Sequence, residues 1–340
     1  MLEAFYLAIF VAMTHFEIDS IFNIQSQKEF ESIALKVFEF QYQNNSVYKT
    51  FCDYLKRNPN TVKEVSNIPF LPIQFFKSKK IISSTATPEI TFKSSGTTGS
   101  TTSKHYVTNT SIYQKSYIKG FNYFYGPTKN YCILALLPSY LEREGSSLIY
   151  MVDDLIKKTN HPDSGFYLDN LEGLIYKLKN LEKRGIKTLL IGVSFALLDV
   201  AEKYNLTLKH TTIMETGGMK GRRKEIIRTE LHTILKNGFG VEKIHSEYGM
   251  TELLSQAYSI GDGIFKTPPW MKVLTRNTEN PLEIQVNNKT GGLNIIDLAN
   301  INSCSFIATQ DLGKTYTNGS FEVLGRFDHS DIRGCNLMAL

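Results

Sequence analysis

Hydrophobic residues recur with a helical period near the N-terminus and gather into short apolar runs later in the chain. Within residues 17–58, Phe30, Ala34, Val37 and Phe38 form a stripe at three- to four-residue spacing. This spacing places them on one side of an α-helix. The region is therefore predicted to be helical, with an apolar side that packs on the rest of the protein.

From residue 131 onwards, apolar runs alternate with amphipathic stretches, which predicts strands alternating with helices. The predicted strands cover residues 131–137, 187–191, 211–214 and 241–244. The predicted helices cover residues 147–158, 195–203 and 220–235, the last with Ile226, Ile227, Leu231, Ile234 and Leu235 facing inward. This alternation is typical of an α/β fold with mainly parallel sheets flanked by helices, in which ligands bind at the carboxyl ends of the strands.

Three segments lie between these two regions. Residues 68–77 are predicted to be extended because prolines interrupt them, and residues 89–92 alternate as a strand does. Residues 111–124 are predicted to form a helix. Its free N-terminal N–H groups are expected to point back toward the segment that separates it from the preceding strand.

Composition narrows the class of protein. Over 340 residues, 42% hydrophobic and 21% charged residues are typical of a globular protein with a large core. The net charge of +5 is modest and no long Lys/Arg block carries it, which argues against nucleic-acid binding. The apolar residues 1–16 lack a basic segment and are too short to cross a bilayer, so no transmembrane segment is predicted. A docking helix, a spurious start and a cleaved signal remain open for them.

The four cysteines are Cys52, Cys132, Cys304 and Cys335. Their wide spacing does not match a metal-binding clip, and a reduced cytoplasmic compartment is the expectation. Cys52, Cys132 and Cys304 lie in helix or strand patterns and are predicted to be part of the core.

The candidate chemistry begins directly after the predicted strand 89–92. The eight positions from Ser94 to Thr101 hold two glycines and six small hydroxyl residues, and Lys104 follows closely. Glycine allows positive φ and a close backbone approach to an anion, while hydroxyl and amide groups donate hydrogen bonds at low bulk. We interpret the stretch as a phosphate-binding loop whose ligands are Ser94, Ser95, Gly96, Thr97, Thr98 and Gly99. A plain surface turn is the alternative, and the Gly-x4-Gly-Lys nucleotide template is not met because Thr101 stands where it requires glycine.

Downstream motifs follow predicted strands in the same way. Tyr248-Gly249-Met250-Thr251-Glu252 combines an aromatic face that stacks on a purine, a glycine for close approach, a donor to phosphate in Thr251 and Mg²⁺-binding oxygens in Glu252. The other motifs are Thr216-Gly217-Gly218-Met219, Thr309-Gln310-Asp311-Leu312-Gly313 and Gly325-Arg326-Phe327-Asp328. Taken singly, each is also compatible with an ordinary turn or helix cap.

In this order the motifs resemble those of the adenylate-forming superfamily, which contains Ser-Ser-Gly-Thr-Thr-Gly and Tyr-Gly-x-Thr-Glu. The resemblance implies ATP and Mg²⁺ as cofactors, with Glu252 as the metal ligand and Thr251, Glu252 and Lys104 in catalysis. It implies that Gly217 and Gly218 line an adenine pocket, and that Asp311 and Arg326 hold the ribose.

The segment Arg333-Gly334-Cys335-Asn336-Leu337-Met338, together with residues 249–258, most resembles LuxE, the long-chain acyl-protein synthetases of fatty-acid reductase complexes. The resemblance implies that a fatty carboxylate becomes acyl-AMP and that the acyl group then moves to Cys335. A thiolate attacks such a mixed anhydride readily, and neighbouring Arg333 favours the thiolate. The implied partners are a carboxylic acid substrate and an acyl reductase, acyltransferase or carrier protein. A buried, inert Cys335 is the alternative.

The same resemblance predicts three parts of the chain: an apolar leader in 1–16, an adenylate-forming catalytic domain in 17–324, and a hinge remnant with tail in 325–340. The C-terminal lid domain of the superfamily is expected to be absent, which argues against coenzyme A as acceptor. An aryl- or acyl-CoA ligase and a non-catalytic nucleotide-binding adaptor are the competing functions. Retention of Glu252 and Asp311 argues against the adaptor.

Overall fold

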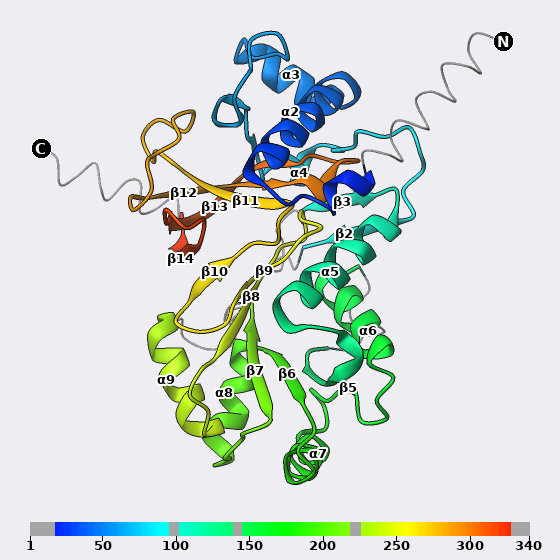
Figure 1. Ribbon diagram of the computed structural model, residues 1–340, viewed down its shortest axis with the longest axis vertical. Helices are drawn as coiled ribbons and strands as arrows, with labels where there is room; N and C mark the ends of the chain where they lie inside the picture. The colour runs from blue at the N-terminus through cyan, green and yellow to red at the C-terminus, as the bar shows by residue number, and fades with distance from the viewer. Residues whose placement is uncertain (1–17, 95–101, 139–144, 218–225, 328–340) are drawn as a thin grey trace, which may run out of the picture.

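The computed structural model describes residues 18–94, 102–138, 145–217 and 226–327. A 12-stranded sheet runs through the molecule, with helices packed against it (Figure 1). The strand order is β11-β12-β13-β14-β10-β9-β8-β7-β6-β4-β5, and β1 pairs with β13. No helix in the described ranges is both long enough and apolar enough to cross a membrane.

One half of the sheet is parallel and carries most of the α/β alternation. Its strands are β5 (Gly165–Phe166), β4 (Cys132–Leu136), β6 (Thr188–Val193), β7 (Thr211–Thr216) and β8 (His245–Tyr248). The helices here are α5 (Thr110–Tyr125), α6 (Ser147–Thr159), α7 (Leu171–Lys183), α8 (Ser194–Lys203) and α9 (Arg228–Phe239). In Figure 1, α5 and α6 lie on one side of these strands and α8 and α9 on the other. Strand β6 is buried along its whole length, as its continuous apolar run predicts.

The other half of the sheet is antiparallel. It contains β9 (Ala257–Ser259), β10 (Ile264–Lys266), β11 (Met271–Arg276), β12 (Thr290–Asp297), β13 (Phe306–Thr315) and β14 (Phe321–Arg326), with the short β1 (Leu71–Pro72) parallel to β13. The N-terminal helices α2 (Gln27–Asn44) and α3 (Ser46–Tyr54) pack here through Phe38 and Tyr48, whose rings contact Phe306 of β13. Short helical turns are also present: η1 (Val65–Asn67), α4 (Phe75–Ser78), η2 (Thr128–Asn130) and η3 (Leu298–Asn300).

The α/β fold is confirmed, and the sheet is mixed. Four of the sequence-derived elements need correction. The strand predicted over 241–244 is wrong because the strand is β8, which begins only at His245. The described part of the helix predicted over 220–235 begins at Arg228, so Ile227 precedes it and is 72% exposed. Residues 68–77 are not extended throughout, since α4 occupies their end.

The fourth correction concerns the glycine-rich stretch. Strands β2 (Ile90–Lys93) and β3 (Lys104–Val107) form a separate antiparallel hairpin, so the stretch connects two hairpin strands and does not follow a strand of the parallel sheet. The helix α5 begins at the opposite end of the hairpin, where Ile90 pairs with Val107. There Glu89 accepts hydrogen bonds from the backbone and hydroxyl of Thr110. The start of α5 is therefore capped by Asn109, whose side chain accepts from the Ser111 N–H, together with the Glu89 carboxylate, and it does not face the loop as predicted.

A buried glutamine attaches the N-terminal helix α2 to the sheet. The Nε2 of Gln41 donates to the carbonyls of Asn300 and Ile301, at 2.9 Å each, and its Oε1 accepts from the Ser305 backbone at 2.9 Å. Gln41 is fully buried. It therefore supplies the hydrogen bonds that three backbone groups of the 300–305 turn would otherwise lack.

We expect Gln41→Ala to lower the free energy of unfolding by about 3 kcal/mol, because each buried polar group left unpaired costs on the order of 1–3 kcal/mol. Chemical denaturation followed by circular dichroism measures this loss. The matched control is Gln43→Ala on the exposed side of the same helix. Its expected effect is within about 0.5 kcal/mol. Equal effects of the two substitutions would contradict the role assigned to Gln41.

Candidate functional site

Three predicted ligand residues from distant parts of the chain meet where β8, β13 and β14 lie near one another. The hydroxyl of Tyr248 donates to Asp311 Oδ2 at 2.7 Å, and Arg326 Nε lies 3.5 Å from Asp311 Oδ1. Asp311 and Arg326 are direct partners across the β13–β14 pair. The Asp311 side chain is 14% exposed and that of Arg326 is 73% exposed. The cluster thus has a mostly buried carboxylate that Tyr248 holds in place, and a cation at the surface.

Burial dominates the electrostatics of this cluster. It raises the pKa of Asp311, against the hydrogen bond from Tyr248 and the positive charges of Arg326 and Arg276. Burial also raises the pKa of Tyr248 well above its ordinary value, and the negative charge of Asp311 adds to the effect. Tyr248 therefore remains a neutral donor to the carboxylate. Its ring packs against Phe265 and Phe321, with centroids 5.9 Å and 5.6 Å away.

The buried carboxyl of Glu252 connects this cluster to the β2–β3 hairpin. Burial raises its pKa, while the polar side chain of Ser103 and the positive charges of Arg326 and Lys77 act in the opposite direction. Ser103 is in turn bound to Ser94: the Ser103 N–H donates to Ser94 Oγ at 2.9 Å, and the Ser94 N–H donates to the Ser103 carbonyl at 3.1 Å. The two ends of the glycine-rich stretch are thus held together beside Glu252.

The backbone around Glu252 is held from two sides. Asn300 Nδ2 donates to the Glu252 carbonyl at 2.7 Å, and His105 Nδ1 lies 2.9 Å from the Thr251 carbonyl. His105 belongs to β3, whereas Asn300 belongs to η3. The segment Tyr248–Glu252 is therefore fixed between the hairpin and the antiparallel half of the sheet.

Close packing explains one of the predicted glycines and backbone conformation explains another. A Cβ on Gly249 would lie 2.5 Å from Glu247 Oε1, so any larger residue would require this carboxylate to shift. Glu247 is itself buried and accepts a hydrogen bond from Thr216 Oγ1 at 2.5 Å. Gly217 has φ +63°, a left-handed conformation that favours glycine, and its carbonyl accepts from Ser194 Oγ at 2.6 Å.

Other predicted residues are placed less fully. Lys104 is exposed and pairs with Lys93 at the loop end of the hairpin. Ser95, Gly96, Thr97, Thr98, Gly99, Gly218 and Cys335 lie outside the described residues, as do residues 1–16. Cys52, Cys132 and Cys304 are buried, as predicted.

The sequence analysis did not single out Ser103, His105, Asp297 or Asn300, although each positions the site. Asp297, fully buried at the end of β12, accepts from the backbones of Leu254 and Ser255 at 2.8 Å and 2.9 Å and from the Ser255 hydroxyl at 2.6 Å. A single acidic residue at the end of the apolar run Leu293–Ile296 was the available signal for it. His105 gave no signal beyond its position next to Lys104.

Comparison with known proteins places the chain in a family. The family model of LuxE acyl-protein synthetases matches residues 20–339. The chain belongs to this family. No match was found among curated protein sequences.

Solved structures resemble the chain in fold. The ATP-bound MatB from Rhodopseudomonas palustris is 17% identical, with a TM-score of 0.52 over 69% of this chain and 47% of that chain. A 2-hydroxyisobutyryl-CoA ligase in complex with 2-HIB-AMP is 10% identical, with a TM-score of 0.64 over 90% of this chain and 69% of that chain. The chain thus spans about half the length of MatB. At these identities the likeness establishes a shared fold.

Because of Asp297, we expect the free energy of unfolding to depend on pH. Burial raises its pKa from the ordinary 3.8 to about 6, so the native state binds this proton more tightly than the unfolded state. The contribution of the group is therefore greatest at low pH and declines as pH rises toward 6 and above. Relative to Asp297→Asn, the unfolding free energy of the wild type should fall by about 2 kcal/mol between about pH 4.5 and about pH 7.5.

Denaturant titrations of both proteins at each pH measure this difference. The hydrogen bonds that Asp297→Asn loses lower its stability at every pH, so the slope and not the offset reports the carboxyl group. The exposed Asp169→Asn serves as the control and should leave the pH profile unchanged. A wild-type-minus-variant difference that stays flat would refute the assignment.

Proposed function

We propose that this protein joins a fatty carboxylate to AMP, using ATP and Mg²⁺, and then transfers the acyl group to its own Cys335. The observation that carries the proposal is the convergence of Tyr248, Asp311 and Arg326 with Glu252 and the Ser94–Ser103 pair. These residues come from separate elements, and a stable fold alone does not require them to meet. Membership of the acyl-protein synthetase family supports the same reading.

Each group has a role in holding ATP. The carboxylate of Asp311 accepts hydrogen bonds from the ribose hydroxyls, and the exposed guanidinium of Arg326 supplies a donor at the same place. The hydroxyl-rich loop that begins at Ser94 donates to the phosphates. Lys104 and Lys93 at the end of the hairpin add positive charge there.

Glu252 fits the requirements of a Mg²⁺ ligand. It offers carboxylate oxygens, which Mg²⁺ prefers, and its burial leaves a negative charge that a cation would compensate. Bound there, the ion would neutralise charge on the phosphate oxygens. Thr251 adds a donor next to this carboxylate.

The first reaction is the attack of a substrate carboxylate oxygen on the α-phosphorus of ATP. A bond forms between this oxygen and phosphorus as the bond to pyrophosphate breaks, and acyl-AMP results. The protein contributes by orientation and charge: Asp311 and Arg326 fix the nucleoside, and the loop holds the phosphates.

In the second reaction the thiolate of Cys335 attacks the acyl carbonyl carbon and AMP leaves with the electrons of the broken C–O bond. The other three cysteines are poor candidates for this role. Burial raises the pKa of Cys52 to about 12, that of Cys132 to about 11 and that of Cys304 further still. The acylated protein then passes the acyl group to an acyl reductase, an acyltransferase or a carrier protein.

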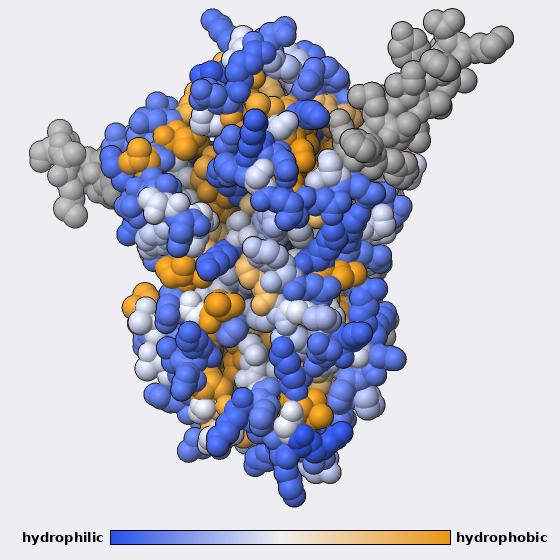
Figure 2. Space-filling model, in the orientation of Figure 1, coloured by the Kyte–Doolittle hydropathy of each residue, from blue (hydrophilic) through white to orange (hydrophobic). Residues whose placement is uncertain are grey.

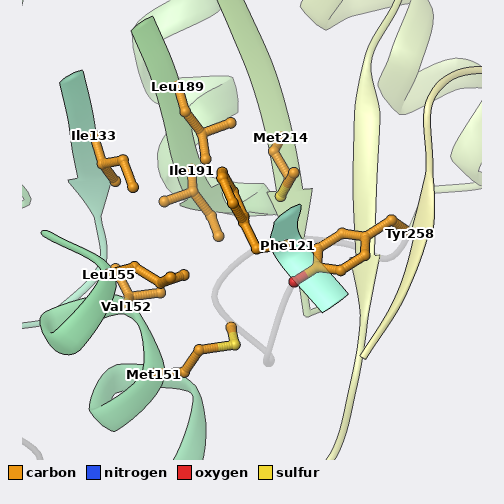
Figure 3. A pocket seen from close by; sticks show the side chains of 9 residues that line it. All are labelled: Phe121, Ile133, Met151, Val152, Leu155, Leu189, Ile191, Met214 and Tyr258. Atoms are coloured by element: carbon orange, nitrogen blue, oxygen red, sulfur yellow. The ribbon is translucent and has the colours of Figure 1, made fainter. Parts of the chain in front are cut away.

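We propose that the alkyl chain of the substrate binds in the apolar space between α5, α6 and the parallel strands (Figure 3). A cavity of about 10 Å³ lies here, lined only by apolar and aromatic side chains: Phe121, Ile133, Met151, Val152, Leu155, Leu189, Ile191, Met214 and Tyr258. Its size suits about one water molecule, so an alkyl chain requires these side chains to move apart. The flexible Met151 and Met214 make such movement inexpensive.

The decisive experiment incubates the protein with ATP, Mg²⁺ and labelled carboxylates from acetate to palmitate. We expect carboxylate-dependent exchange of pyrophosphate into ATP, and label on the protein that hydroxylamine releases. Asp311→Ala and Glu252→Gln should each lower exchange at least about 100-fold, because binding and charge stabilisation of this size depend on single groups. Cys335→Ala should keep exchange and lose the protein label.

Glu279→Gln, at an exposed position outside these motifs, is the control and should change neither readout. Label that persists on Cys335→Ala would refute the acceptor. A requirement for added coenzyme A would favour a CoA ligase instead. Absence of exchange with every carboxylate would overturn the enzyme proposal and favour a nucleotide-binding adaptor.

The alkyl site has its own test. Ile191→Phe adds bulk to the cavity, so we expect the KM for palmitate to rise at least about tenfold while that for a short carboxylate changes little. The matched control is Leu190→Phe, which adds the same bulk at a buried neighbour outside the cavity. Both variants should lose similar stability. An unchanged chain-length preference in Ile191→Phe would place the alkyl chain elsewhere.

A further inference from the structure

His105 is a buried titratable residue that the proposed mechanism does not use. It lies on β3 between the exposed Lys104 and the half-buried Tyr106, and its side chain is fully buried. Its ring packs edge-on against Phe76 of α4, with centroids 5.8 Å apart. The strand alternation thus directs Lys104 outward and His105 into the protein.

The hydrogen bond of His105 fixes its tautomer. Its Nδ1 faces the carbonyl oxygen of Thr251 at 2.9 Å, and a carbonyl only accepts, so Nδ1 must carry the hydrogen. Its Nε2 has no hydrogen-bond partner in the described parts of the chain. Burial lowers the pKa of His105 to about 4, which keeps the ring neutral at physiological pH. A neutral ring with hydrogen on Nδ1 is therefore a permanent single donor to Thr251.

The hydrogen bond from His105 joins two parts of the protein whose relative position the proposed chemistry requires to be fixed. On one side is the hairpin, in which Ser94 and Ser103 hold the two ends of the glycine-rich stretch together. On the other side are Thr251 and Glu252. Another interaction between the two parts is that of the Ser103 side chain with Glu252, and it depends on a carboxylate that the proposal assigns to the metal. The His105 bond to the backbone is independent of that carboxylate.

We propose that His105 is a positioning residue for acyl activation, holding Thr251 and Glu252 at a fixed place relative to the hairpin that binds phosphate. This inference rests on the proposed function. Because the bond reaches the backbone carbonyl of Thr251, it fixes the turn whichever ligand the side chains hold. Its loss displaces groups that act in the transition state, so kcat is affected more than the KM for ATP.

The test compares His105→Phe, which keeps a ring against Phe76 but has no donor, with His105→Asn, whose amide N–H lies near the position of Nδ1. Pyrophosphate exchange of His105→Phe should show kcat lowered by about 10- to 100-fold with the KM for ATP within about threefold. His105→Asn should recover at least about tenfold of that loss. The matched control is Tyr131→Phe, which removes another buried side-chain donor to a backbone carbonyl, the 2.9 Å bond to Tyr125. It should leave kcat within about twofold.

A second readout does not depend on activity. Amide hydrogen exchange in residues 250–253 and 102–107 should accelerate together in His105→Phe and remain unchanged in Tyr131→Phe. A kcat within twofold of the wild type in His105→Phe, or unchanged amide exchange in both segments, would overturn the proposal. If the wild type shows no pyrophosphate exchange with any of the carboxylates, the proposed function fails. The amide exchange alone then decides whether His105 holds the turn.

Discussion

The structure depends on satisfying the polar backbone of one largely buried turn, the segment from Tyr248 to Ser255. This segment leads from strand β8 toward β9, and its residues Glu252 to Ser255 are buried, so their N–H and carbonyl groups are removed from water. Asp297 accepts from Leu254 and Ser255, Asn300 donates to Glu252, and His105 donates to Thr251. A buried backbone group without such a partner costs free energy comparable to a lost hydrogen bond. These three side chains therefore fix where the candidate catalytic groups lie.

The partners come from elements far apart in the sequence, which makes the turn a junction of the whole fold. Asp297 is the last residue of the antiparallel strand β12, and Asn300 is the last residue of η3, whose carbonyl Gln41 of α2 binds from the other side. His105 belongs to the hairpin that carries the glycine-rich stretch. On the face of the molecule that Figure 2 shows, hydrophilic and apolar side chains are mixed. The polar contacts that organise the site are buried in the protein.

Much of the architecture was predictable because local patterns and the tertiary structure agree. The buried strands β4 and β6 and the helices α5, α6 and α8 lie where the apolar periodicity places them. One prediction failed because residues of a predicted ligand-binding motif themselves form a strand. His245–Tyr248 contains polar residues yet forms β8, because Ser246, Glu247 and Tyr248 are buried by neighbouring strands and paired with β9. No local pattern reveals such burial.

The sequence by itself determined the family and the parallel half of the sheet, because the order of the motifs and the apolar runs of the strands are both local features of the chain. The tertiary structure alone decided that the glycine-rich stretch belongs to a hairpin, that Asp311 is bonded to Tyr248 and Arg326, and that His105, Asn300 and Asp297 hold the turn. The physical reason is sequence separation. A hydrogen bond between Thr251 and His105 joins residues 146 positions apart, and no periodicity spans such a distance.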